Sequence, residues 1–189
     1  MTAQASRPWR NLNPGDLRTL PPGQHWIGQT GTDNGPGGPF AIFGTERDGW
    51  GAVATCLMAY QDLHGLHTVR GIIGRYAPAF ENDLGGYVSL VCRTIGVQPD
   101  DAINVHTYQT MHALVLAIGL AEGGRSLAWS EVARTDGITA ALARANHGAI
   151  TPPSPMKTTP PVIHTDVAHD DAERTEALNV ASLAAAKGH

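Results

Sequence analysis

The chain has 189 residues, of which 42% are hydrophobic, and a formal net charge of −4 at pH 7. This length and composition suffice for one hydrophobic core and hardly for two, so we expect one domain with appendages. The negative charge argues against nucleic acid as a partner, no apolar run is long enough to span a bilayer, and the N-terminal residues lack the apolar core of a classical secretory signal.

The first predicted element is a turn within residues 10–18, RNLNPGDLR. Pro14 fixes its own φ, Gly15 accepts a positive φ, and Asn13 and Asp16 can bond their own backbone. Short amides and carboxyls on a rigid loop also suit a binding site for a polar ligand such as a sugar. The sequence therefore leaves a plain turn and a binding loop as alternatives.

Strands are predicted only near the N-terminus. Residues 25–27 and 39–43 are short strand candidates, and the glycine-rich TGTDNGPGG lies between them. This pattern predicts a small hairpin or flap rather than a large sheet.

Helical spacing of apolar residues then predicts five helices up to residue 145. The segment 107–124 is the most apolar and should run through the core. The segment 129–145 contains Asp136-Gly137, which we expect to interrupt it. The five segments begin near Thr45, Thr68, Asp83, Thr107 and Trp129.

The composition changes after Gly148. Residues 149–167 are rich in proline and threonine and predict an extended linker. Residues 168–189 are rich in alanine and predict a C-terminal helix or tail that serves as an attachment segment. We therefore expect the functional domain to lie within residues 1–148.

Cysteines and histidines give no chemical signature. Cys56 and Cys92 each fall on an apolar helix face, as reduced core thiols do. His64 and His67 are three residues apart, but no further ligand stands at a spacing that would complete a metal set. Neither a Gly-x-Ser-x-Gly motif nor a phosphate loop occurs. We predict no metal and no cofactor.

Three glutamates are candidate catalytic residues. Glu46 lies in the first turn of a predicted helix, where the helix dipole favours the anion, and a helix-start charge is the plain alternative. Glu81 precedes a predicted helix and has an equally simple interpretation as part of its cap. Glu122 ends the most apolar helix, so partial burial and the negative helix end are both expected to raise its pKa.

A protonated carboxylic acid beside an ionised carboxylate is the arrangement by which glycosidases divide acid from base or nucleophile. Gly123 and Gly124 follow Glu122 and would leave room for a bulky substrate. The alternative for Glu122 is an ordinary charged helix end with a glycine cap.

Four segments resemble, in this order, a family of phage and prophage proteins labelled virion structural proteins or peptidoglycan hydrolases. They are RNLNPGDLR, FAIFGTERDGW, TVRGIIGRYAPAFENDLGGYV and AIGLAEGG. The family opens with Arg-Asn-Asn-Asn-Pro-Gly-Asn-Ile/Leu-Arg, and its segments look like pieces of the lysozyme and lytic transglycosylase superfamily in a rearranged order. This chain departs from the pattern at Leu12, Asp16 and Gly123, which puts the substrate contacts in doubt.

The resemblance implies a mainly helical, lysozyme-like α+β domain, permuted in order, with a small β-hairpin. It also implies a virion-associated enzyme that cleaves peptidoglycan strands as a lytic transglycosylase or muramidase. The protein would be found in the virion, or in the host cytoplasm before assembly, and would act in the periplasm and cell wall. A noncatalytic virion protein with the same fold and a peptidoglycan endopeptidase are the alternatives.

Under this hypothesis Glu122 is the general acid. The sugar groove is then lined by six further residues, and the C-terminal tail is free to contact other virion proteins. The six predicted substrate-binding residues are Asn11, Asn13, Asp16, Tyr76, Tyr87 and Tyr108.

Overall fold

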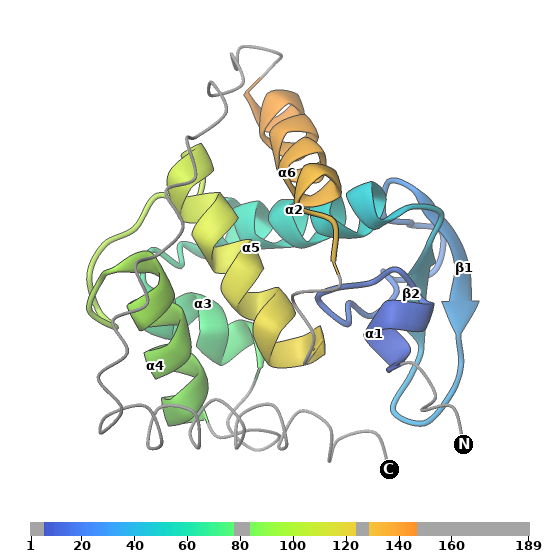
Figure 1. Ribbon diagram of the computed structural model, residues 1–189, viewed down its shortest axis with the longest axis horizontal. Helices are drawn as coiled ribbons and strands as arrows, with labels where there is room; N and C mark the ends of the chain where they lie inside the picture. The colour runs from blue at the N-terminus through green and yellow to red at the C-terminus, as the bar shows by residue number, and fades with distance from the viewer. Residues whose placement is uncertain (1–5, 78–83, 124–128, 147–189) are drawn as a thin grey trace, which may run out of the picture.

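The computed structural model describes residues 6–77, 84–123 and 129–146 (Figure 1). Within these ranges the chain forms six helices and one two-stranded antiparallel sheet, which confirms the predicted mainly helical α+β class. None of these helices is long and apolar enough to cross a bilayer. The elements are α1 (Arg7–Arg10), β1 (Gln29–Asp33), β2 (Phe40–Phe43), α2 (Glu46–His64), α3 (Val69–Tyr76), α4 (Leu84–Ile95), α5 (Tyr108–Gly123) and α6 (Glu131–Ala145).

The predicted linker and C-terminal tail lie outside the described residues, and so does Gly148, where the predicted domain ends. The division of the chain into a domain, a linker and a tail therefore stays a prediction.

The hairpin has the expected size, but its first strand was predicted in the wrong place. β1 and β2 are antiparallel, with Asp33 opposite Phe40. β1 begins after the predicted strand at 25–27 and extends into the glycine-rich segment that was expected to separate the two strands. β2 contributes the buried side chains of Phe40, Ala41 and Phe43, whereas β1 alternates half-buried and exposed small or polar residues. β1 is a strand because of its backbone pairing with β2, which hydrophobic patterning does not reveal.

The helix boundaries follow the predicted caps. The Oγ1 atoms of Thr45 and Thr68 accept hydrogen bonds of 3.1 Å from the backbone N–H groups three residues on, and Thr107 makes a longer bond of the same kind at 3.4 Å. The Asp48 carboxylate accepts a hydrogen bond from the Thr45 hydroxyl at 2.7 Å. Gly96 ends α4 with a φ of 72°. Capping therefore explains where these helices begin and end.

Helix α5 is the central helix, as its apolar sequence predicts. It contacts α1, α2, α4 and α6, and Met111, Leu114 and Ile118 on it are fully buried. In Figure 1, α3 and α4 lie on one side of α5, and α1 and the hairpin lie on the other. The C-terminal end of α5 therefore lies between these two groups of elements.

The predicted interruption of the last helix at Asp136-Gly137 is wrong, because α6 is continuous from Glu131 to Ala145. Gly137 lies where α6 packs against α2. A Cβ at this position would lie 2.9 Å from the Gly51 nitrogen and 3.0 Å from Trp50 Cβ. This glycine therefore permits two helix backbones to approach closely, and it does not end the helix.

Two glycines allow a test of how the N-terminal loop packs on α2. A Cβ at Gly49 would overlap the Leu12 carbonyl oxygen and lie 2.8 Å from Pro14 Cδ, whereas a Cβ at Gly74 in α3 would meet nothing within 4 Å. We expect Gly49→Ala to lower the free energy of unfolding by about 1–3 kcal/mol through overpacking. Gly74→Ala should raise it by about 0.5–1 kcal/mol, because alanine is the better helix former. Urea denaturation midpoints measure both effects, and a gain in stability from Gly49→Ala would contradict this packing.

Candidate functional site

A cleft of about 650 Å³ lies between the N-terminal segment with its hairpin and the ends of three helices. Its volume is in the range of sites that hold a small molecule or a few units of a polymer. The charged and aromatic residues on the first wall are Arg7, Asp16, Arg18, Trp26 and Phe40. Those on the helical wall are Tyr60, Arg75, Tyr76 and Glu122.

The structure brings three of the predicted site residues together in this cleft, namely Glu122, Asp16 and Tyr76. They come from the end of α5, the N-terminal loop and the end of α3. Among the described residues that line the cleft, Glu122 and Asp16 are the two carboxylates. The opening loop therefore shares a cavity with the glutamate that ends the apolar helix.

Glu122 is half-buried in the last turn of α5, and its negative charge acts on three neighbouring groups. Burial is the main cause of the raised pKa of both Tyr76 and Tyr87, and the charge of Glu122 raises both further. The same charge contributes to the raised pKa of Arg7. Glu122 thus has a cationic and two phenolic neighbours.

Tyr87 interacts with Glu122, although it is not among the residues that line the cleft. A hydrogen-bonding interaction with the Glu122 carboxylate adds to its raised pKa. The Tyr87 hydroxyl nevertheless has no partner at regular hydrogen-bond geometry. The buried phenol and the Glu122 carboxylate therefore interact electrostatically.

The conformation of the N-terminal loop differs from the turn chemistry predicted for it. The residues with positive φ are Leu12 and Asp16, each at 49°, and not Gly15. A Cβ at Gly15 would overlap the Tyr76 hydroxyl and lie 2.6 Å from Val53 Cγ2, and the Tyr76 hydroxyl donates to the Gly15 carbonyl oxygen. Glycine is required here for close approach of the loop to the helical wall.

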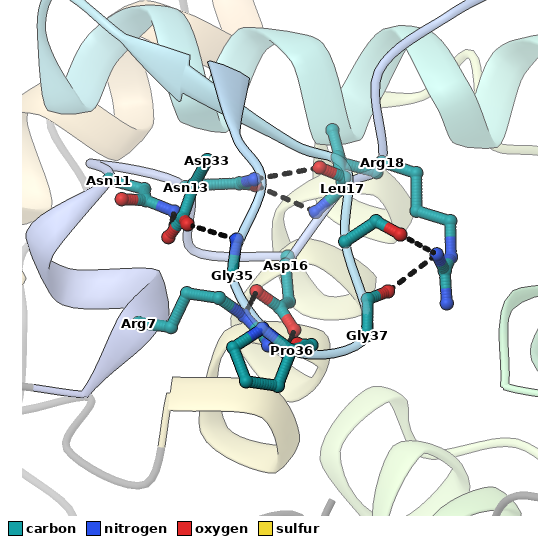
Figure 2. A network of polar contacts seen from close by, with 12 residues as sticks. Arg7, Asn11, Asn13, Asp16, Leu17, Arg18, Asp33, Gly35, Pro36 and Gly37 are labelled. Carbon is teal, nitrogen blue, oxygen red and sulfur yellow. Dashed lines mark hydrogen bonds and ion pairs between the residues drawn. The ribbon is translucent and has the colours of Figure 1, made fainter. Parts of the chain in front are cut away.

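Arg7 and Asp16 form an ion pair that the sequence analysis did not identify (Figure 2). Arg7 Nε donates to Asp16 Oδ1 at 3.0 Å and Nη2 to Oδ2 at 2.5 Å. Nη1 donates to the Pro36 carbonyl at 2.9 Å, and the guanidinium carbon lies 3.6 Å from the centre of the Phe40 ring. The hydrogen bond with Asp16 is the main cause of the raised pKa of Arg7. Both oxygens of Asp16 therefore accept charge-assisted hydrogen bonds.

The two predicted asparagines make hydrogen bonds within the protein and are not among the residues that line the cleft. Asn13 is fully buried, and its Nδ2 donates to the carbonyls of Leu17 and Ala41, both at 2.9 Å. Its Oδ1 accepts from the Leu17 N–H at 2.8 Å. Asn11 Nδ2 donates to Asp33 Oδ2 at 2.9 Å. Figure 2 shows both amides joining the N-terminal loop to the hairpin.

The remaining predicted residues lie elsewhere. The Glu46 carboxylate accepts from the Ser130 N–H at 2.8 Å and so connects the start of α2 to the N-cap of α6. Tyr108 begins α5, at the end opposite Glu122, and its hydroxyl donates to Thr135 Oγ1 at 3.3 Å. Glu81 lies outside the described residues. Their assignments as site residues stay predictions.

Four further cleft residues were not among the predicted site residues, namely Arg18, Trp26, Tyr60 and Arg75. Trp26 Nε1 donates to the Arg18 carbonyl at 2.8 Å, which holds the indole beside the loop. Tyr60 and Arg75 lie on different helices, and the Arg75 guanidinium carbon is 5.2 Å from the centre of the Tyr60 ring. These residues meet only through the tertiary fold, so no local spacing could have identified them.

Asn13 is expected to be the most sensitive polar position of the N-terminal loop. Asn13→Ala removes three hydrogen bonds and leaves backbone groups of Leu17 and Ala41 buried without these partners. We expect a loss of about 2–4 kcal/mol in the free energy of unfolding, measured by urea denaturation. Gln109→Ala, at an exposed position of α5, is the control and should change stability by less than about 0.5 kcal/mol. Equal effects of the two variants would show that the Asn13 bonds contribute nothing.

Asp33 makes stability depend on pH. Hydrogen bonds from Asn11 and from the Gly35 N–H, followed by the charges of Arg10 and Arg7, lower the pKa of Asp33 from its ordinary value of 3.8. A lowered pKa in the folded state stabilises the fold above pH 3.8, and this contribution is lost as the pH falls through the lower folded value.

Asp33→Asn should therefore be less stable than the parent at neutral pH, and the difference should shrink as the pH falls below 3.8. Urea midpoints at neutral and acidic pH measure this. Asp136→Asn, an exposed position on α6, should give a small difference that stays constant. A constant difference for Asp33→Asn as well would refute the coupling.

Comparison with known proteins places the chain among phage proteins. It matches no described protein-family profile. It is similar to Protein P5 of Pseudoalteromonas phage PM2, with 30% identity over 130 residues. The match covers 68% of this chain and 79% of the phage protein. The chain therefore belongs to the family of this phage protein.

Proposed function

We propose that this protein is a virion-associated enzyme that cleaves the glycan strands of bacterial peptidoglycan. The observation that carries the proposal is the position of Glu122, which ends the buried helix α5 at a cleft whose other wall is the N-terminal loop. The kinship with a phage protein supports a role in a phage. The resemblance of four segments to phage peptidoglycan hydrolases supports the choice of substrate.

Glu122 is the general acid in this proposal. A half-buried carboxylic acid on a cleft wall is suited to donate a proton to the glycosidic oxygen as the bond to the leaving sugar breaks. When a hydroxyl group of the substrate attacks the same anomeric carbon, the resulting carboxylate takes up the hydroxyl proton. One carboxyl group then acts first as acid and then as base.

The state of Asp16 favours this single-carboxylate mechanism over one with two carboxylates. A second carboxylate must be available to activate water or to attack the sugar. Both oxygens of Asp16 instead accept hydrogen bonds from Arg7, at 3.0 and 2.5 Å. Asp16 therefore shapes the wall of the cleft, and a lytic transglycosylase is the preferred reaction class.

The tyrosines near Glu122 have a supporting role. The raised pKa values of Tyr76 and Tyr87 keep both phenols protonated at neutral pH. The Glu122 carboxylate interacts with the Tyr87 phenol and raises its pKa, while the Tyr76 hydroxyl donates to the Gly15 carbonyl of the N-terminal loop. Tyr87 is thus a positioning residue and Tyr76 joins the two walls.

The aromatic rings in the cleft fit a carbohydrate. Trp26 and Phe40 lie on one wall and Tyr60 on the other. Aromatic faces offer flat apolar surfaces on which the C–H faces of sugar rings pack, and polar groups around them fix orientation. The cleft is therefore suited to a strand of sugar units.

Removal of the acidic proton tests the proposal. Glu122→Gln preserves the size of the side chain but cannot donate a proton as an acid, so clearing of purified cell walls should slow by about 10²–10⁴-fold. Turbidity measures the rate. Glu131→Gln, at an exposed position in the first turn of α6, is the matched control and should retain the parent rate.

Each outcome has a defined meaning. Equal clearing by the parent and Glu122→Gln would remove Glu122 from the mechanism, and loss in Glu46→Gln alone at unchanged stability would move the acid to α2. No clearing by the parent would favour the noncatalytic virion protein. Mass spectrometry of the products distinguishes cut sugars from released stem peptides, and stem peptides would indicate an endopeptidase instead.

A further inference from the structure

We infer that Arg18 and Arg75 bind carboxylate groups of the polymer, so that the cleft accepts an acidic glycan strand and discriminates against a neutral one. This inference rests on the proposed function and names the chemical class of its substrate. It depends on how the charges of the cleft are paired.

The cleft carries an excess of positive charge. Its lining includes Arg7, Arg18 and Arg75 among the described residues, against Asp16 and Glu122. Arg7 and Asp16 pair with each other, which leaves two guanidinium groups facing one carboxyl group. The whole chain has a net charge of −4. The positive charge is therefore local to the cleft, where low-dielectric walls focus it.

Arg18 is held in place by neutral groups. Its Nη1 donates to the carbonyl of Gly37 at 2.6 Å and to that of Gly38 at 3.3 Å. Its guanidinium carbon lies 5.2 Å from the centre of the Phe40 ring. These contacts orient the exposed side chain (Figure 2) without cancelling its charge.

Arg75 is oriented in a similar way on the opposite wall. Its Nη2 donates a hydrogen bond at 3.0 Å to His64 Nε2, where the ring nitrogen is the acceptor. Its guanidinium carbon stacks 5.2 Å from the centre of the Tyr60 ring. Neither Arg75 nor Arg18 is in an ion pair with another described residue. Arg75 and Arg18 thus keep their charge for a ligand.

A carboxylate is the ligand that best fits two such groups. The guanidinium fork matches the two oxygens of a carboxylate, and its charge strengthens each hydrogen bond. A peptidoglycan strand carries carboxylates on its stem peptides, and on its acidic sugar wherever the stem peptide has been removed, whereas chitin carries none. A glycan strand bound between the two walls of the cleft would bring its carboxylates to Arg18 on one wall and to Arg75 on the other.

Binding without cleavage tests this inference separately from the reaction. The full chain with Glu122→Gln is mixed with insoluble cell walls that have been extracted with hydrofluoric acid to remove phosphate polymers. The bound fraction is measured by sedimentation at low and high salt. Arg18→Gln and Arg75→Gln are added singly to this background, and Arg47→Gln is the control. Arg47 is exposed in the first turn of α2 and does not line the cleft.

We expect Arg18→Gln and Arg75→Gln each to weaken wall binding about tenfold and to reduce its dependence on salt. Arg47→Gln should bind as the parent does. Amidation of the wall carboxylates should weaken the parent and remove the difference between it and the two variants. Binding to chitin should be weak and unaffected by either variant. Strands freed of stem peptides then distinguish sugar carboxylates from peptide carboxylates.

Several results would overturn the inference. They are undiminished binding to amidated walls, equal binding to chitin, equal weakening by Arg47→Gln, or no wall binding by the parent. Circular dichroism and urea midpoints of each variant exclude a loss of fold as the cause. Cleavage plays no part in this binding assay. Its outcome therefore does not depend on whether the protein clears cell walls in the turbidity experiment.

Discussion

The buried amide of Asn13 is the interaction on which the cleft depends. It bonds the backbone of Leu17 and of Ala41, and so fixes the N-terminal loop to the hairpin strand β2. The amide is buried, so water cannot replace these partners. Loss of the three hydrogen bonds would leave buried polar groups of Leu17 and Ala41 unpaired and would lower the free energy of unfolding. The loop also packs directly on Gly49 of α2. One wall of the cleft is therefore fixed to the hairpin and to α2, although it is built from irregular chain.

The opposite wall is fixed by close packing rather than by polar bonds. Trp50 of α2 packs against α5 at Gly119, where a Cβ would lie 2.9 Å from Trp50 Cζ3. This contact lies one turn before Glu122 and determines where the end of α5 reaches the cleft. Trp50 also packs edge-on against Trp129, with ring centres 5.6 Å apart. The carboxyl group at the cleft is thus supported by the aromatic part of the core.

The sequence predicted the features that depend on local pattern and missed those that depend on distant contacts. Apolar spacing and threonine caps located the helices, because both signals lie within one segment. β1 was misplaced since its pairing with β2 forms it, and Gly137 was misjudged since its reason lies on another helix. Of the candidate site, Glu122 and Asp16 were identified by residue type and position. Arg7 was not, because its partner and its role appear only when loop, hairpin and helix meet.

The two positive-φ residues give a physical meaning to the departures from the family pattern. Leu12 and Asp16 each have a φ of 49°, and the opening motif that residues 10–18 resemble has asparagine at both positions. Asparagine tolerates the left-handed region better than other residues with a side chain, and leucine there costs about 1–2 kcal/mol. Leucine at position 12 recovers part of that cost by packing against the core, and aspartate at position 16 gains the ion pair with Arg7. The backbone conformation alone is a sufficient reason for asparagine at these two positions of the motif. The replacement of asparagine by Leu12 and Asp16 in this chain therefore does not by itself remove a contact with a sugar.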